Sequence, residues 1–268
     1  MTEISASLVK ELRDLTGAGM MDSKRALQEV DGDVEAARRL LRERGMAAAG
    51  KRAGRETTEG EVLVTIAGNT GAIVGVGCET EPVSKNEEFL GFAERVLEAV
   101  EQGGADAAAS LEEERMELVG RLGENIVVAG AARMEAGAGE MLAEYVHPPA
   151  NKRGVLVNVR GDNPAGARRL AMHIAAAAPR WATREEVPAE VLQSEREIYL
   201  ASDEVQSKPE QAREKIVEGM LGKRFFAAYP GGVLADQTWI HDAGKSVTQA
   251  LEEEGLEVVE FVRYALGE

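Results

Sequence analysis

The feature of this sequence that most constrains its fold is a plan that occurs twice. Residues 139–142 (GEML) echo residues 60–63 (GEVL), and residues 154–159 (GVLVNV) echo residues 71–76 (GAIVGV). Each copy reads as two β-strands around a turn, followed by a helical pattern, NEEFLGFAERVLEAVEQ in the first and ARRLAMHIAAAA in the second. The first copy adds a helix near residues 111–122 and a strand in NIVVAGAARM. Two related units predict an α+β core of two subdomains with antiparallel sheets.

The second unit is interrupted. Residues 186–225 read as two helices broken at Ser207-Lys208-Pro209, and the chain then returns to a helix in SVTQALEEEG and a closing strand in LEVVEFVRYAL. This pattern predicts an inserted antiparallel helical hairpin, a coiled coil that protrudes from the core. Its facing apolar residues are Val191, Ile198 and Val205 on one helix and Ala212, Ile216 and Met220 on the other. The first subdomain then covers residues 61–138, and the second covers residues 139–185 and 226–268.

Three short helical patterns precede the core. They predict a three-helix module over residues 1–45, with Asp33 as the N-cap of the third helix. A module this small is typical of a binding unit, because it has little room for a cleft. Residues 46–60 (MAAAGKRAGRETTEG) show no apolar face, and we expect them to form a linker.

Composition limits where such a chain acts. An apolar content of 44% supports real cores, and no apolar run reaches membrane-spanning length. The amphipathic start, MTEISASLVKELRDL, is neither a signal nor a transit peptide. The single cysteine, Cys78, forbids an internal disulfide and suits a reducing compartment. We therefore expect a cytoplasmic protein with no membrane partner.

The charge is uneven along the chain. Residues 1–56 hold 11 basic and 10 acidic side chains, whereas the other 212 residues hold 20 and 37. A surface that negative repels phosphate backbones, so we expect no direct nucleic-acid binding. It favours a protein partner, although the same charge also serves solubility.

Few residues suggest catalysis. Gly75-Val76-Gly77 follows a strand, but the third glycine of a dinucleotide loop is missing and Pro82 stands where the helix should start. His173 lies in an alanine-rich helix and is typical of a packing residue, and Cys78 is typical of a buried thiol. Three scattered histidines and one cysteine form no spaced metal cluster. We expect neither a catalytic set nor a metal or cofactor.

Two stretches resist a purely structural interpretation. In residues 16–24 (TGAGMMDSK), Met20 and Met21 follow two glycines between helices, where adaptable thioethers suit a partner's apolar groove. In residues 74–86 (VGVGCETEPVSKN), an apolar strand stops at Cys78 and an acidic, proline-stiffened tip follows.

Residues 12–27 (LRDLTGAGMMDSKRAL) resemble the N-terminal signature of bacterial elongation factor Ts. The resemblance extends through the basic linker, the duplicated core, the tip, AMHIAAAAP, the hairpin and FVRYALGE. It implies a UBA-like N-terminal module and a guanine nucleotide exchange factor for elongation factor Tu, the GTPase that delivers aminoacyl-tRNA, with no cofactor and no covalent chemistry. Some members continue past the closing strand, and we expect any contact made there to be absent.

The resemblance also implies which residues touch the GTPase. In the family the tip usually reads Thr-Asp-Phe-Val and disturbs the magnesium bound beside GDP. Here Thr80 and Val83 match, Glu81 stands for the aspartate, and Pro82 replaces the phenylalanine wedge.

Further contacts follow from the same resemblance. It implies contacts of the N-terminal module with the nucleotide-binding domain through Gly19, Met20, Met21 and Lys24, and a contact of the His173 helix with a more distant domain.

Two rival functions stay open. One is a non-catalytic module that binds elongation factor Tu or another GTPase with weakened exchange, which Pro82 favours. The other is an enzyme acting on a nucleotide, which only the glycine-rich strands favour. A homodimer through the hairpin or a 2:2 complex with the GTPase is compatible with either exchange or binding.

Overall fold

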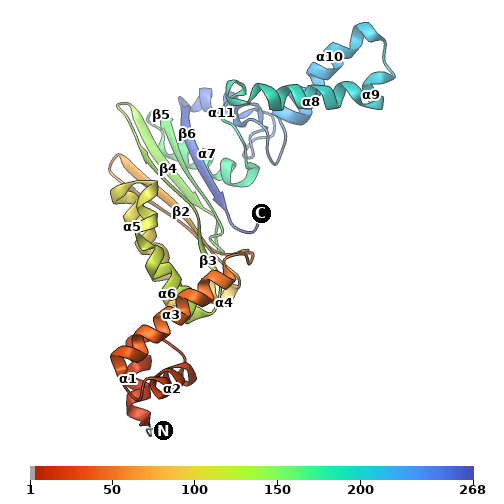
Figure 1. The fold of residues 1–268 in the computed structure, drawn as a ribbon. Coiled ribbons are helices and arrows are strands. Elements are labelled where there is room, and N and C mark those ends of the chain that lie inside the picture. The colour runs from red at the N-terminus through yellow and green to blue at the C-terminus, as the bar shows by residue number, and fades with distance from the viewer. Residues whose placement is uncertain (1–3) are drawn as a thin grey trace.

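The computed structural model describes residues 4–268 and has three parts in a row (Figure 1). A helical module at the N-terminus leads into a core of two sheets, and a helical hairpin projects from the far end of that core. This architecture confirms the predicted α+β class. None of the described helices combines the length and the apolar character needed to cross a membrane.

The N-terminal module consists of α1 (Ala6–Thr16), α2 (Met20–Glu29) and α3 (Val34–Arg52). Ser5 and Asp33 cap α1 and α3 by accepting backbone N–H groups, as N-cap residues do. Gly17 ends α1 with φ of 67°, a left-handed conformation that favours glycine. The buried residues of the module form one cluster of its own: Val9, Leu12, Ala26, Leu27 and Ala37.

The predicted linker is partly wrong. Helix α3 does not end near residue 45 but continues through Met46 to Arg52, and only residues 53–58 connect it to the core without regular helix or strand. Its second half lies against α6 (Glu112–Leu122), and Ala49 is buried in the first core subdomain. Alanine and glycine can pack closely without forming an apolar stripe, so the sequence pattern concealed this contact.

The core contains two three-stranded antiparallel sheets, as the duplicated plan predicts. One sheet has the order β1 (Glu59–Ala67), β2 (Thr70–Cys78), β3 (Ile126–Glu135). The other has the order β4 (Glu140–Val146), β5 (Arg153–Arg160), β6 (Glu257–Ala265). Helices α5 (Glu87–Gly103) and α6 pack on the first sheet, and α7 (Pro164–Ala177) and α11 (Val247–Glu254) pack on the second.

The inner faces of the two sheets meet in a separate cluster: Val62, Ile73, Met134, Leu156 and Leu266. Glycine makes the close approach possible. A Cβ at Gly130 would lie 2.3 Å from the Tyr264 ring, and a Cβ at Gly154 would lie 2.5 Å from Val62. Both distances are far below van der Waals contact, so these strand positions need glycine.

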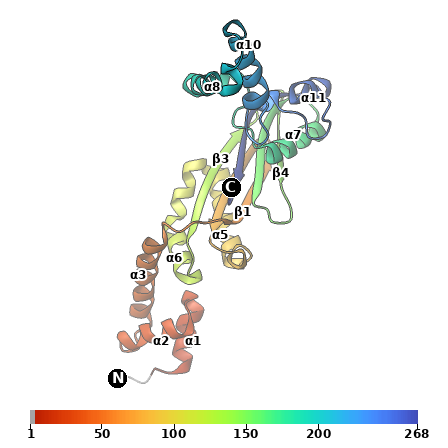
Figure 2. The same cartoon turned by 90° about the vertical axis from the view of Figure 1, so that its right-hand side faces the viewer.

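The hairpin comprises α8 (Ala189–Ala201), α9 (Asp203–Gln206) and α10 (Glu210–Met220), followed by a turn of π-helix over Leu221–Phe226. It stands away from the core in both views (Figures 1 and 2). The predicted break at Ser207–Pro209 is present, but the first helix is already interrupted at Ser202, which is extended with ψ of 144°. The interruption changes the phase of the helix, so Val205 is buried while Ile198 is 58% exposed. Ile198 is therefore not one of the facing residues.

The remaining elements are short: α4 (Glu81–Ser84), 3₁₀ helix at Ala105–Leu111, Arg184–Glu186 and Leu234–Asp236.

Candidate functional site

The tip after β2 is an exposed and well-defined turn. Helix α4 begins at Glu81, and Pro82 occupies its first turn, where the missing N–H of proline costs nothing. Thr80, Glu81 and Pro82 are exposed, and Val83 is half-buried against the first core subdomain. Within residues 4–268 the Glu81 carboxylate has no hydrogen-bond or ion-pair partner, so it is free to meet another molecule.

Two carboxylates hold the base of this tip. Glu124 accepts the Thr80 backbone N–H at 3.0 Å and the Thr80 hydroxyl at 2.5 Å. Glu79 accepts the Asn125 backbone N–H at 2.6 Å. The β2–β3 backbone ladder ends at the pair of Cys78 and Ile126. Beyond that pair, the two carboxylates replace backbone carbonyls as hydrogen-bond acceptors, and each links the end of one strand to the end of the other. The tip therefore projects from a fixed base.

The cysteine beside the tip is structural. Cys78 is fully buried, and its Sγ donates to the Thr80 carbonyl at 3.3 Å. Burial, with a smaller contribution from Glu124, raises the pKa of the Cys78 thiol to about 12. The thiol thus stays protonated and does not act as a nucleophile at neutral pH.

The methionine pair lies on the surface, as the sequence predicts. Met20 and Met21 open α2 and are 46% and 63% exposed, and Gly19 and Lys24 are exposed beside them. Leu15, at the end of α1, is 59% exposed and was missed in the sequence. Its spacing from Leu8 and Leu12 is that of one helix face and favours a core position, but α1 ends one residue later and leaves Leu15 outside the core.

His173 does not lie on the surface. Its side chain is fully buried, stacks on Trp239 with ring centroids 5.2 Å apart, and places Nε2 3.0 Å from Gln237 Oε1. Nδ1 accepts the Ile240 backbone N–H at 3.3 Å. Burial lowers the pKa of His173 to about 4, against a partly opposing hydrogen bond to Gln237. The packing role that the sequence predicts for His173 is confirmed, and in the free chain its side chain is not exposed to a partner. The contact of its helix with a more distant domain stays a prediction.

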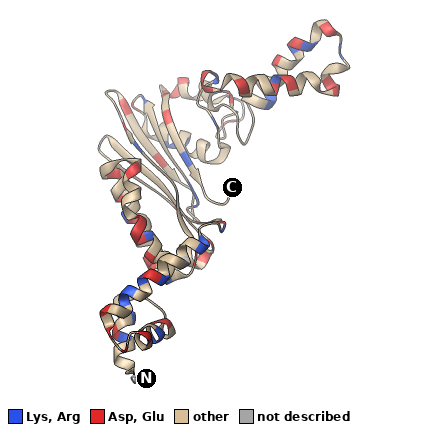
Figure 3. Cartoon of the chain, in the orientation of Figure 1, with Lys and Arg blue, Asp and Glu red and all other residues tan. Residues whose placement is uncertain are grey.

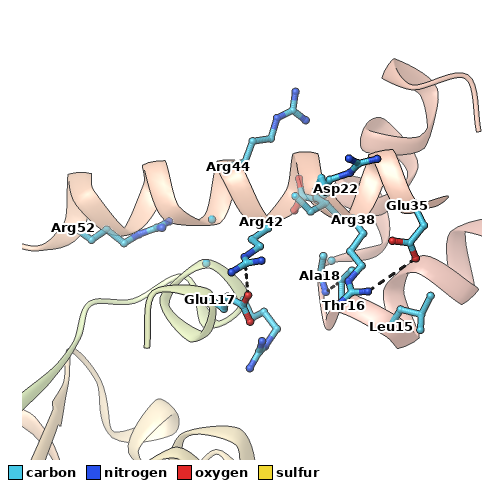
Figure 4. Close-up of a pocket in the computed structure, with 16 residues that line it drawn as sticks. Leu15, Thr16, Ala18, Asp22, Glu35, Arg38, Arg42, Arg44, Arg52 and Glu117 are labelled. Carbon is cyan, nitrogen blue, oxygen red and sulfur yellow. Dashed lines mark hydrogen bonds and ion pairs between the residues drawn. The ribbon is translucent and has the colours of Figure 1, made fainter. Parts of the chain in front are cut away.

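An arginine-lined cleft of about 420 Å³ lies between the N-terminal module and α6 (Figure 4). Thr16, Ala18 and Gly19 line one end of it, so the signature loop borders the cleft. Its arginines are mostly paired within the chain: Arg38 with Glu35 at 4.0 Å, Arg42 with Glu117 at 3.1 Å, Arg44 with Glu29, and Arg121 with Glu88 at 2.7 Å. Figure 4 shows Arg52 at one end of the labelled set and well apart from Arg38, so these cations do not converge on one small anion.

Charged side chains are unevenly placed over the described part of the chain. Basic residues gather on α3, and acidic residues mark the hairpin and the core helices (Figure 3). Among the residues that the structure describes, no group of three or more histidine, cysteine, aspartate or glutamate side chains could hold a metal ion.

Comparisons with known proteins identify the family. Residues 79–268 match the family model described as "Elongation factor TS". The chain is 42% identical to elongation factor Ts of Thioalkalivibrio sulfidiphilus (strain HL-EbGR7), over 99% of this chain and 92% of that protein. It is 41% identical to elongation factor Ts of Arthrobacter sp. (strain FB24), over the full length of both, and 40% identical to that of Citrobacter koseri (strain ATCC BAA-895 / CDC 4225-83 / SGSC4696), over 100% of this chain and 93% of that protein. The chain therefore belongs to the elongation factor Ts family, the nucleotide exchange factors of elongation factor Tu.

Proposed function

We propose that this chain releases GDP by holding the nucleotide-binding domain of elongation factor Tu at two separated surfaces. The tip, Thr80 to Val83, presses toward the bound magnesium, and the surface formed by Leu15, Met20 and Met21 holds the domain in place. The observation that carries the proposal is a tip that is both exposed and fixed: Glu81 and Pro82 face solvent while Glu124 holds Thr80.

Linkage explains why binding alone drives exchange. A partner that binds the nucleotide-free GTPase more tightly than the GDP-bound form must weaken GDP by the same factor. The tip needs no chemistry for this purpose, and an exchange factor neither binds nor turns over GDP on its own.

Pro82 changes how the tip acts. Proline lacks the aromatic ring that the family places here, and a ring at an interface centre can contribute well over about 1 kcal/mol. It fixes φ instead, so the loop loses less entropy on docking. The shape of the tip backbone then matters more than the volume of the side chain.

The same residue supports a second candidate function. Without the aromatic wedge, the chain could bind elongation factor Tu and leave GDP in place. Such a binding module would form a complex of normal affinity yet fail to speed GDP release.

Stopped-flow release of a fluorescent GDP from elongation factor Tu, with and without the chain, separates the two functions. We expect Pro82→Gly to slow release by a few-fold, because the added loop entropy is worth ~0.4–1 kcal/mol. Pro82→Phe should speed release if the partner keeps the groove usual in the family, and slow it by a clash if that groove is adapted to proline, which is the outcome we expect. Pro209→Gly is the matched control, since Pro209 is likewise an exposed proline at the start of a helix but lies on the hairpin.

The outcomes are distinct. If neither Pro82 substitution changes the rate of GDP release, the tip takes no part in the mechanism. Exchange would then depend on the other contacts, such as the surface of Leu15, Met20 and Met21. Binding of the unmodified chain with no acceleration of release would establish the binding module instead. A translation factor acts where translation takes place, so we place the chain in the cytoplasm.

A further inference from the structure

Helix α3 belongs to two hydrophobic cores at once. Ala37, in its first half, is fully buried in the cluster of the N-terminal module. Ala49, in its second half, is 5% exposed and lies in the cluster of the first core subdomain with Val119 of α6. The helix has 19 residues, a length of about 28 Å at 1.5 Å per residue. It therefore joins module and core as a continuous rod.

The rod crosses α6 at a contact between two glycines. A Cβ added at Gly120 would lie 2.7 Å from the Cα of Gly45 and 3.4 Å from its carbonyl carbon. A Cβ added at Gly45 would lie 3.5 Å from the Cα of Gly120, an ordinary van der Waals distance. The crossing is thus asymmetric: only position 120 demands glycine, and the atoms that an added Cβ would meet are backbone atoms, which cannot swing aside.

Two other contacts fix the module on the same helix. Arg42 pairs with Glu113 and with Glu117, the latter at 3.1 Å. The Arg121 side chain lies against Gly17: a Cβ added at Gly17 would lie 2.6 Å from the Arg121 Cδ.

The second of these contacts reaches further into the core. Arg121 also pairs with Glu88 of α5 at 2.7 Å. Gly17 precedes the methionine pair by three residues, so this contact ties the signature loop to the core.

We propose that Gly120 is a positioning residue for nucleotide exchange, because the close crossing of α3 and α6 sets the distance between the Met20–Met21 surface and the tip at Thr80–Val83. The proposal rests on the proposed function, in which both surfaces meet one GTPase. Two linked contacts reinforce each other only when their spacing matches the partner. The rod makes that spacing a fixed property of the free protein.

The geometry indicates how sensitive the spacing is. Relief of the contact at Gly120 needs a shift of about 1 Å to restore ordinary contact distance. With Ala49 as the pivot, about 6 Å further along α3, that shift tilts the rod by about 10°. The start of α3, about 22 Å from that pivot, would then move by about 4 Å. After a displacement of that size, the Met20–Met21 surface and the tip can no longer contact a rigid partner at the same time.

The test compares alanine at three glycines. Gly120→Ala should tilt the module, whereas Gly45→Ala, at the same crossing, should be tolerated. Gly50→Ala is a second control on the same helix, because a Cβ there would meet nothing within 4 Å. Arg42→Glu is an independent variant that places a carboxylate against Glu113 and Glu117 and repels α6 without a steric clash.

Two measurements are made on the full chain. Spin labels at Glu11→Cys and Glu94→Cys, both exposed positions, report the module-to-core distance, and the buried Cys78 stays unlabelled. We expect a narrow distance distribution that shifts or broadens in Gly120→Ala and Arg42→Glu but not in the two control variants. GDP release from elongation factor Tu should slow by at least roughly tenfold in Gly120→Ala, the order expected when linked contacts no longer engage together. Unchanged far-ultraviolet circular dichroism shows that each variant is folded.

The outcomes separate this inference from the function it rests on. A distance distribution in Gly120→Ala equal to that of the unmodified chain overturns the inference, and so does a shifted distribution with undiminished exchange. If Met20→Ala and Met21→Ala slow exchange while Gly120→Ala does not, the methionine contact stands and the positioning role is refuted. If Gly120→Ala slows exchange while both methionine variants are inert, the methionine surface is not what the crossing positions, and the inference is overturned as stated.

Discussion

The buried His173 makes a definite prediction about acid stability. In the folded chain its Nδ1 accepts the Ile240 N–H, so Nε2 carries the proton and donates to Gln237 Oε1. A second proton on Nδ1 would face that N–H, donor against donor, inside a core without water access. The charged form is therefore strongly disfavoured in the folded state.

The sign and the size follow from linkage. The folded pKa is about 4 against 6.5 for an unperturbed histidine, so the unfolded chain takes up a proton first as the pH falls. The stabilisation is complete above pH 6.5 and is lost as the pH falls toward 4. The full difference corresponds to about 3 kcal/mol of unfolding free energy, and most of it is gone at pH 4.5.

Urea unfolding of the chain and of His173→Gln, at pH 7 and pH 4.5, measures this contribution. Glutamine keeps a donor for Gln237 but leaves the Ile240 N–H unpaired, so the variant should be less stable at pH 7 by about 1–3 kcal/mol. Both proteins carry the same carboxylates, whose titration cancels in the comparison. We expect the variant to lose about 2–3 kcal/mol less unfolding free energy than the unmodified chain between the two pH values. Equal losses would refute the assignment of a buried neutral histidine.

Three further predictions concern the contact surfaces. Met20→Ala and Met21→Ala should each weaken binding of elongation factor Tu, measured by titration calorimetry, with changes in unfolding free energy within about 0.5 kcal/mol, as is usual for exposed sites; a loss of stability without a loss of affinity would return both to a structural role. Deletion of residues 1–45, which leaves the second half of α3 on the core, should leave a cooperative thermal unfolding transition and a weaker complex, and a core that no longer folds would show that it depends on the N-terminal module. Glu124→Gln keeps only one acceptor for Thr80 and should slow GDP release by about fivefold, the effect of about 1 kcal/mol, whereas unchanged release would mean that the tip needs no fixed base.

The regular parts of this fold were readable in the sequence because they follow apolar patterns. The paired strands and α5, with Phe89, Phe92 and Val96 on its buried face, repeat at the periods of strand and helix. The extension of α3 to Arg52 was not readable. It depends on Gly45 and Ala49 meeting α6 through backbone and methyl groups, and such residues give no apolar stripe.

The candidate site also has features that the sequence predicted and features that it did not. The glycines before Met20 and Met21 predicted an exposed pair, and its exposure is confirmed. The Glu124–Thr80 contact joins residues 44 positions apart, and no local pattern announces it. The packing role of His173 was readable from its alanine-rich helix and is confirmed. The resemblance implied a partner contact for that helix but could not tell which of its faces is buried.

The shared helix α3 also has a consequence for synthesis of the chain. Gly45 leaves the ribosome 75 residues before Gly120, so the second half of α3 emerges without the helix that will cover it. At typical rates of about 5–20 residues per second the wait lasts about 4–15 s. Leucine or valine in that stretch would expose an apolar, aggregation-prone surface on the nascent chain for the whole interval. Alanine and glycine expose very little apolar surface. The composition that makes this segment resemble a linker therefore also keeps it from aggregating until α6 has been made.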